Sequence, residues 1–279
     1  MSGSQQITPE RRRWVGEQAA AGHCGPSVLD AMKASGWDEL VAIQAVEEIL
    51  ASEVARRHLS GKPVPEIVGE PDASRLWVHD KWVKVLLRLQ RPRVVALGEF
   101  LSPDECEALR ADANSRLARS ETVETRSGGS EVNVARTSQG MFFQRGETEL
   151  CQRIEARIAA LVNWPVENGE GIQVLRYSPG AEYKPHYDYF DPSQPGTAAI
   201  LKRGGQRVGT VVMYLNTPEQ GGATIFPDVG LDVHAIEGNA VFFAYGLPDP
   251  SSLTLHGGAP VVQGEKWVAT KWMRESKFE

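Results

Sequence analysis

The chain after Gly169 consists almost entirely of short apolar or alternating segments separated by turn residues. Seven such segments follow one another: GIQVLRY, EYKPHYDY, RVGTVVMYL, GATIF, NAVFFAY, SLTLH and KWVATKWM. Short strands in close succession cannot each bury an apolar face alone, so they must pair and pack against one another. The pattern predicts a β sandwich or a small barrel.

Further strands and two helices are expected before this region. The segments Val83–Leu89 and Arg93–Leu101 have strand character. Ser102 to Glu105 form a Ser-x-x-Glu capping box with proline at the first helical position, so a helix should run from there to about Ala118. A second helix is expected over Glu147–Leu161, and both would pack outside one sheet. The polar residues 119–135 are expected to form a long exposed loop.

The N-terminal part of the chain has a different pattern. Apolar residues between 8 and 59 recur at helical spacing, most clearly over Asp38–His58, where Asp38 can cap the helix start. The next segment, Ser60–Ser74, concentrates proline, glycine and serine, as linkers and surface loops do. We therefore predict an N-terminal helical region with its linker over residues 1–80 and a mainly β domain with flanking helices over residues 81–279.

Charge and composition exclude several classes of partner. The net charge of −6 argues against a broad phosphate-binding surface, so we expect no nucleic-acid partner. No apolar run approaches the roughly 20 residues that cross a bilayer. The first residues also lack the apolar stretch of a secretory signal, so we expect no membrane partner and a cytoplasmic location. The cysteines are three in number and far apart, which predicts free thiols.

A metal site is predicted by His186, Asp188 and His256. His186 and Asp188 are two residues apart, so on a strand both side chains would face the same way and could hold one cation. Taken alone, this pair could equally be a structural hydrogen bond. His256 adds a third donor at the end of the predicted strand SLTLH. Two histidines and one carboxylate leave coordination positions open, as non-haem iron(II) oxygenases require, whereas zinc favours closed sites or a hydrolytic water.

Lys266 supports an oxygenase that uses a 2-oxo diacid. It opens the predicted strand KWVATKWM, and a Gly- and Pro-rich turn separates it from His256. An antiparallel return of the chain would bring Lys266 near the metal. A diacid that chelates iron through its 2-oxo acid end needs a cation at its far carboxylate, and Lys266 can supply it. A phenol such as Tyr177 can add a hydrogen bond.

Three blocks closely resemble the catalytic core of prolyl 4-hydroxylases of the collagen-type and algal or bacterial group. They are QVLRYSPGAEYKPHYDYF, QRVGTVVMYLNTPEQGGATIFP and LHGGAPVVQGEKWVATKWM, within a likeness that runs from about Arg93 to Arg274. The resemblance implies a double-stranded β-helix (jelly roll) and the cofactors iron(II), 2-oxoglutarate and dioxygen, with ascorbate as a further one. It implies metal ligands at His186, Asp188 and His256 and cosubstrate contacts at Tyr177, Thr224 and Lys266.

The resemblance also implies a substrate. Tyr183, Arg207 and Trp272 match positions that bind peptide or take part in catalysis, although Tyr183 and Trp272 can equally be core aromatics and Arg207 an exposed strand charge. We expect a peptide or protein substrate that contains proline. The alternatives are hydroxylation of another amino acid, free or in a peptide, and a metal-dependent interaction scaffold without activity. The N-terminal helical region is a candidate module for binding a protein partner.

Overall fold

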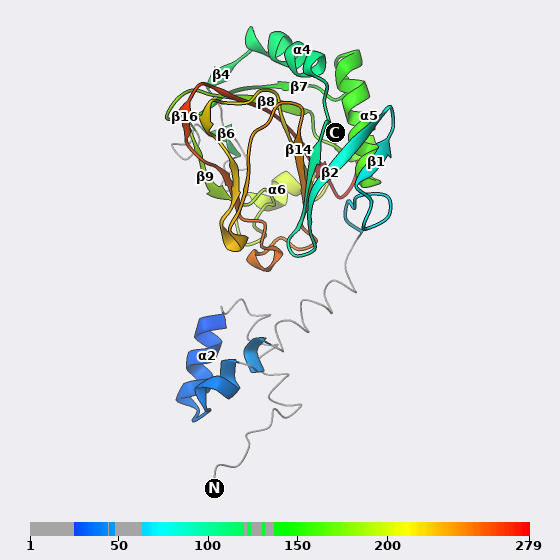
Figure 1. Ribbon diagram of the computed structural model, residues 1–279. Coiled ribbons are helices and arrows are strands. Elements are labelled where there is room, and N and C mark those ends of the chain that lie inside the picture. Colours follow the sequence, from blue (N-terminus) through cyan, green and yellow to red (C-terminus); the bar gives the residue numbers. More distant parts are fainter. Residues whose placement is uncertain (1–24, 44, 48–62, 120–121, 124–129, 132–136) are drawn as a thin grey trace. The chain divides into compact units, whose positions relative to one another are not determined.

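The computed structural model describes residues 25–43, 45–47, 63–119, 122–123, 130–131 and 137–279, which belong to two compact units (Figure 1). The units divide between Lys62 and Pro63, and not at residue 80 as predicted. The segment after Pro63 belongs to the second unit because its backbone is bonded there. The N–H groups of Glu66 and Val68 donate to the carbonyls of Val162 and Leu161, at 3.0 and 2.9 Å.

The first unit is helical where it is described. Helix α2 spans Gly25–Ala34, and residues 39–43 and 45–47 are also helical. The predicted cap at Asp38 is confirmed, because its Oδ1 accepts hydrogen bonds from the N–H groups of Leu40 and Val41. A small core joins these helical segments: Val28, Met32, Ala42, Ala45 and Val46. The rest of the predicted helix, to His58, lies outside the described residues.

The second unit contains a large antiparallel sheet (Figure 1). In the described residues it has nine strands, in the spatial order β1 (Arg75–Val78), β2 (Lys81–Leu89), β3 (Arg93–Gly98), β14 (Ala240–Ala244), β10 (Arg207–Tyr214), β17 (Lys266–Arg274), β8 (Ile172–Tyr177), β7 (Gln139–Phe143) and β4 (Ala118–Arg119). The strands predicted at Val83–Leu89 and Arg93–Leu101 are therefore neighbours in this sheet.

A smaller sheet packs against the large one. Its four strands are, in order, β13 (Leu231–Val233), β12 (Thr224–Phe226), β15 (His256–Gly258) and β9 (Tyr183–His186). Two short pairs complete the described strands: β11 (Gln220–Gly221) with β16 (Val261–Gln263), and β5 (Thr122–Val123) with β6 (Ser130–Glu131). The two facing antiparallel sheets form the expected jelly roll, with a shared core in which Val212 and Tyr214 of β10 meet Phe226 of β12.

The helices cover the outer face of the large sheet. They are α4 (Pro103–Asn114) and α5 (Glu149–Val162), while α6 (Thr197–Leu201) and the 3-10 turns η1 (Val166–Asn168), η2 (Pro227–Val229) and η3 (Pro250–Ser252) lie in connections. The predicted capping box at the start of α4 is present, with Ser102 and Glu105 bonded to each other's backbone N–H groups. Helix α4 ends at Asn114 and does not reach the predicted Ala118, because strand β4 begins at Ala118.

Strict alternation along the strands separates two cores. In β10, Val211 and Met213 face the helices, whereas Val212 and Tyr214 face the small sheet. The alternation shifts at a bulge between Arg207 and Gly209. Because of this bulge Val208 belongs to the outer core, and its neighbour Arg207 turns to the inner face. The bulge therefore decides which side of the sheet receives a charged side chain.

Two predicted segments differ from the structure. The segment SLTLH is not a strand: it begins in the turn η3, passes through Leu253 with a positive φ of 55°, and only then enters β15 at His256. Its buried residues are Thr254 and His256, whereas Leu253 and Leu255 are only half-buried, so the apolar alternation does not mark the buried face of a strand. Most of the loop predicted over 119–135 lies outside the described residues, apart from Arg119 and the strand pair β5–β6.

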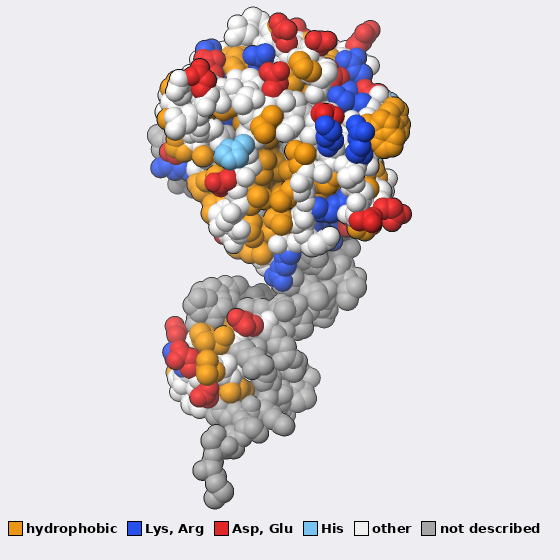
Figure 2. All heavy atoms as spheres, in the orientation of Figure 1, with side chains coloured by type: hydrophobic (Ala, Val, Ile, Leu, Met, Phe, Trp, Pro, Cys, Tyr) orange, Lys and Arg blue, Asp and Glu red, His pale blue; other side chains and the backbone are white. Residues whose placement is uncertain are grey.

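The described surface carries several exposed large hydrophobic side chains: Leu40, Trp77, Trp82, Leu86, Phe142, Ile236 and Val262. Figure 2 shows hydrophobic side chains gathered on one face of the second unit, with charged groups around them.

No helix among the described residues is both long and apolar enough to span a membrane. Cys106 and Cys151 are buried free thiols, as predicted, and Cys24 lies outside the described residues.

Candidate metal centre

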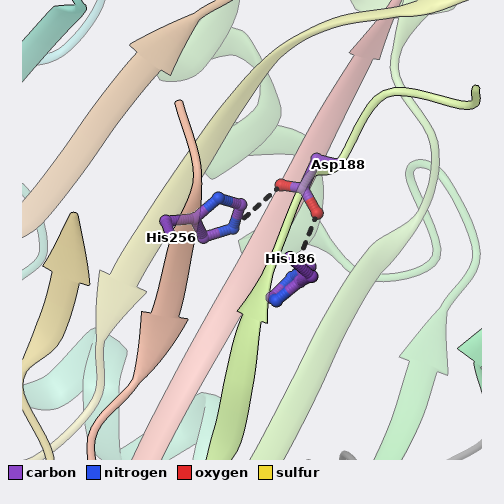
Figure 3. A group of neighbouring side chains, drawn as sticks. All are labelled: His186, Asp188 and His256. Atoms are coloured by element: carbon purple, nitrogen blue, oxygen red, sulfur yellow. Dashed lines mark ion pairs between the residues drawn. The ribbon is translucent and has the colours of Figure 1, made fainter. Parts of the chain in front are cut away.

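The three predicted ligands meet at the junction of two paired strands. His186 ends β9 and His256 begins β15, and the antiparallel register places these two residues opposite each other. Asp188 follows β9 and turns toward both rings (Figure 3). His186 Nε2 lies 3.6 Å from Asp188 Oδ1, and His256 Nε2 lies 3.5 Å from Oδ2. All three donor atoms fall within 4.8 Å of one another.

The backbone fixes the orientation of both imidazoles. The Nδ1 atom of His186 is 2.9 Å from the carbonyl oxygen of Lys184, and that of His256 is 2.9 Å from the carbonyl oxygen of Thr254. A carbonyl can only accept, so in the neutral ring each Nδ1 carries the proton and each Nε2 keeps its lone pair. Both lone pairs are therefore directed toward the Asp188 side, which is the arrangement of metal-binding histidines.

The pKa values of His256 and Asp188 also favour metal binding. Burial lowers the pKa of His256 to about 4, so the ring is neutral at neutral pH. Burial also opposes ionisation of Asp188, but the electrostatic influence of the neighbouring His256 and His186 rings outweighs it and holds the pKa of the carboxyl well below its usual range. A neutral imidazole and a charged carboxylate are the forms that bind a metal.

A pocket lies between the sheets beside these donors. It contains eight of the nine predicted site residues: Tyr177, Tyr183, His186, Asp188, Thr224, His256, Lys266 and Trp272. Apolar side chains from the large sheet, including Leu175, Val212 and Val268, form part of its wall. The lining of one pocket therefore combines the metal donors, apolar side chains and Lys266.

Lys266 is a buried cation in the wall of this pocket. Its side chain is 4% exposed, and no hydrogen bond or ion pair to it occurs in the described part of the chain. The rings of Tyr177 and Tyr214 lie 5.7 and 5.9 Å from its Nζ. Burial lowers the pKa of Lys266 to about 8. A buried ammonium without a counter-charge in a pocket wall is suited to bind an anionic group of a ligand.

The route by which Lys266 reaches the pocket differs from the prediction. Lys266 belongs to the large sheet, where it pairs with Tyr177, whereas His256 belongs to the small sheet. The chain between them does not return antiparallel to β15, because β16 pairs with β11 instead. Lys266 faces the small sheet across the pocket: a Cβ added to Gly258 would lie 3.7 Å from its Nζ.

Thr224 also lines the pocket, and a hydrogen bond from Tyr214 orients its hydroxyl group. The hydroxyl of Tyr214 donates to Thr224 Oγ1 at 2.9 Å. Since the Thr224 oxygen accepts this bond, its own hydrogen remains for a ligand. Lys266 and Thr224 can thus both donate to a carboxylate that enters the pocket. Tyr214 was not predicted, although its place in the alternation of β10 puts it on the pocket face.

Tyr183 and Trp272 line the pocket, and Arg207 packs on Trp272. Tyr183 stacks on the ring of His186 with centroids 3.7 Å apart. Arg207 does not line the pocket, but its guanidinium lies 4.0 Å from the Trp272 ring centroid. It forms a two-pronged ion pair with Glu170 at 2.7 and 2.9 Å, so it is not an exposed strand charge. This pair holds Trp272 at the pocket wall.

The donor set fits iron(II). Two imidazole nitrogens and one carboxylate on one side of a site are the ligands of non-haem iron oxygenases. A zinc hydrolase would need neither an unpaired ammonium nor a closed apolar wall in the same pocket. The buried Lys266 also fits the far carboxylate of 2-oxoglutarate, because an ion pair formed there would offset the cost of burying the charge.

Comparison with known proteins agrees with this geometry. Residues 172–274 match the family described as the 2OG-Fe(II) oxygenase superfamily. The jelly roll also resembles the structure of the viral collagen prolyl hydroxylase vCPH from Paramecium Bursaria Chlorella virus-1, solved as a 2OG complex. That likeness has a TM-score of 0.50 and 30% identity, and it covers 65% of this chain and 95% of the viral one. The fold and the site thus define an iron(II)- and 2-oxoglutarate-dependent dioxygenase.

Relatives of known activity make the family more specific. Prolyl 4-hydroxylase 1 of Arabidopsis thaliana is 44% identical over 232 residues, which cover 73% of this chain and 79% of the relative. Prolyl 4-hydroxylase 5 of the same plant is 39% identical over 221 residues, covering 72% and 74%. The chain belongs to the prolyl 4-hydroxylase family.

Proposed function

We propose that this protein hydroxylates proline residues within a peptide or protein. One observation carries the proposal: the three metal donors, the unpaired Lys266 and the Tyr183 and Trp272 side chains all line a single pocket. The three donors would bind iron(II) and Lys266 would bind 2-oxoglutarate, while the two aromatic side chains offer a surface for the substrate. The relationship to prolyl 4-hydroxylases supports proline as the residue that is modified.

Each group of residues has a distinct task in this reaction. His186, Asp188 and His256 would hold iron(II), and Lys266 with Thr224 would bind the far carboxylate of 2-oxoglutarate. Together the metal and the diacid supply the activation of dioxygen that hydroxylates a C–H bond. The apolar wall around the pocket excludes water from the reacting groups. No side chain has to act as an acid, base or nucleophile on the substrate.

Aromatic side chains near the metal suit a polyproline II chain. Tyr183 covers one side of His186, and Trp272 lies on the opposite sheet with Phe142 at a ring distance of 6.5 Å. Phe142 is half exposed, so this aromatic surface extends from the pocket to the outside. Proline-rich segments bind such aromatic grooves because their backbone is already ordered. A proline-rich peptide is therefore the substrate class that we expect.

The test is incubation with iron(II), 2-oxoglutarate and a panel of peptides, followed by mass spectrometry. We expect a mass gain of one oxygen atom on proline, coupled to consumption of 2-oxoglutarate. Matched peptides with alanine in place of proline are the substrate control, and Asp188→Ala is the enzyme control. Oxygen found on another amino acid would replace proline as the substrate, and full turnover by Asp188→Ala would contradict the metal assignment.

Three finer points stay predictions from the sequence. They are the use of ascorbate, a cytoplasmic location, and a protein partner for the N-terminal helical region. Ascorbate is tested by omitting it from the assay and following the loss of activity over successive turnovers. The partner is tested by comparing substrate selection by the full chain with that of a variant altered on the surface of helix α2 (Gly25–Ala34).

A further inference from the structure

A buried chain of hydroxyl groups ends on the carboxylate of Asp188. The Thr210 hydroxyl lies 2.7 Å from Asp188 Oδ2, and the Tyr245 hydroxyl lies 3.0 Å from Thr210 Oγ1. Thr210 is 0% exposed and Tyr245 is 2% exposed. No other hydroxyl or amide group donates to this carboxylate in the described part of the chain. Both hydroxyl groups are therefore buried, and the hydrogen bonds between them end on a single metal-binding residue.

The direction of both hydrogen bonds follows from chemistry. The Asp188 carboxylate is ionised and can only accept, so Thr210 must donate its single hydrogen to Oδ2. The Thr210 oxygen must then accept from Tyr245. Burial and the nearby Asp188 charge raise the pKa of Tyr245 well above its usual value, so this phenol keeps its proton. Tyr245 therefore donates to Thr210, and Thr210 donates to Asp188; the reverse directions are excluded.

The fold explains why Asp188 needs such support. His186 and His256 lie on paired strands of the small sheet, and each ring is held by a backbone carbonyl. Asp188 lies beyond the end of β9 and has no strand partner. Thr210 belongs to β10 in the large sheet, and Tyr245 directly follows β14, the strand paired with β10. The hydroxyl chain thus ties the third ligand to the opposite sheet.

We propose that Thr210, oriented by Tyr245, is a positioning residue that fixes the rotation of the Asp188 carboxylate. In the orientation that it holds, one oxygen faces each imidazole, at 3.6 and 3.5 Å. Without the Thr210 hydroxyl the carboxylate can turn about its Cβ–Cγ bond, so the three donors no longer converge. Loss of such an outer hydrogen-bond partner typically weakens metal binding by about 10- to 100-fold.

The test measures binding of Mn(II) to the otherwise metal-free protein, with free Mn(II) followed by electron paramagnetic resonance. Thr210→Val is expected to raise the Kd by at least about tenfold, and Tyr245→Phe by less. Thr210→Ser keeps the hydroxyl and should stay within a few-fold of the original protein. Thr197→Val is the matched control, because Thr197 is also buried and donates at 2.7 Å, but to the Asp191 carbonyl. This control should bind Mn(II) normally.

A second readout separates positioning from packing. Under anaerobic conditions the iron(II) and 2-oxoglutarate complex has a weak visible band that depends on the metal ligands. This band should shift in Thr210→Val and return in Thr210→Ser. Unchanged Mn(II) binding and an unshifted band in Thr210→Val would overturn the proposal, as would a serine variant as weak as the valine one. Neither measurement uses a peptide, so failure of the proline assay would leave both results valid.

Discussion

Replacing Lys266 by methionine is expected to change stability and cosubstrate binding in opposite directions. In the ligand-free protein this ammonium is buried without a counter-charge, so the folded state bears the cost of its desolvation. Methionine has a similar length and no charge, and it removes that cost. The same substitution removes the cation that would bind the far carboxylate of 2-oxoglutarate. A stabilised protein that has lost its cosubstrate is therefore the expected result.

The magnitude follows from the burial of the lysine. The difference between its usual pKa of 10.5 and the lowered pKa of about 8 corresponds to about 3 kcal/mol of folding free energy. For a domain of this size, that raises Tm by roughly 6 to 12 °C. Loss of a desolvated charge partner costs about 2 to 5 kcal/mol in binding, so affinity for 2-oxoglutarate should fall by roughly 30-fold to several thousand-fold.

The stability difference must also depend on pH. The pKa of Lys266 is about 8 in the folded protein and near 10.5 in the unfolded chain, so between these values the unfolded state binds more protons. The stability contributed by this site therefore rises as pH increases from about 8 to 10.5. Lys266→Met lacks this rise. Its advantage over the original protein should be largest below pH 8 and should shrink above it.

The assay combines chemical unfolding across pH with anaerobic titration of 2-oxoglutarate. Lys202→Met is the matched control, because Lys202 is exposed and its replacement should change neither property. The reasoning is refuted if Lys266→Met unfolds more easily at pH 7 while it still binds 2-oxoglutarate normally. Such a result would mean that Lys266 is solvated and serves packing through its methylene chain.

Three further substitutions test other parts of the structure. Glu105→Gln should cost about 3 kcal/mol at pH 7 in urea unfolding, since hydrogen bonds from Arg157 overcome burial and lower the Glu105 pKa to about 2; this cost should disappear as pH falls from 4.5 to 2. Gly258→Ala adds a methyl group to the pocket wall at an ordinary contact distance of 3.7 Å from Lys266 Nζ, where it occupies space that a carboxylate bound to the ammonium would need; calorimetry should show about tenfold weaker 2-oxoglutarate binding. Arg207→Lys loses the two-pronged pair, so steady-state kinetics should show a KM for peptide raised about tenfold with 2-oxoglutarate affinity unchanged.

Local signals were the most accurate part of the sequence analysis. The capping box at Ser102 and the cap at Asp38 are both present, because a cap involves only residues within one turn of each other. The segments that form β10 and β17 were also recognised as strands. The segment before His256 was misread as a strand, since apolar residues can alternate in a loop as they do in a strand.

Residues that act through partners far along the chain were missed. Thr210 lies in β10 and Tyr245 directly follows β14, and only the pairing of these two strands brings their hydroxyls together. Glu170 gave no signal of its own, although it holds Arg207. Arg207 itself would face the helices if the alternation of β10 continued, and the bulge before Gly209 turns it inward. A bulge has no reliable signature in a single sequence.

The sequence by itself determined the chemistry of this protein, because residue type decides what can bind a metal or a diacid: two imidazoles, one carboxylate and one ammonium. The tertiary structure decided where these groups meet. His256 reaches His186 through the register of two short strands, and Lys266 reaches the pocket from the opposite sheet. Strand order, register and bulges are set by packing of the whole core, which no local segment encodes.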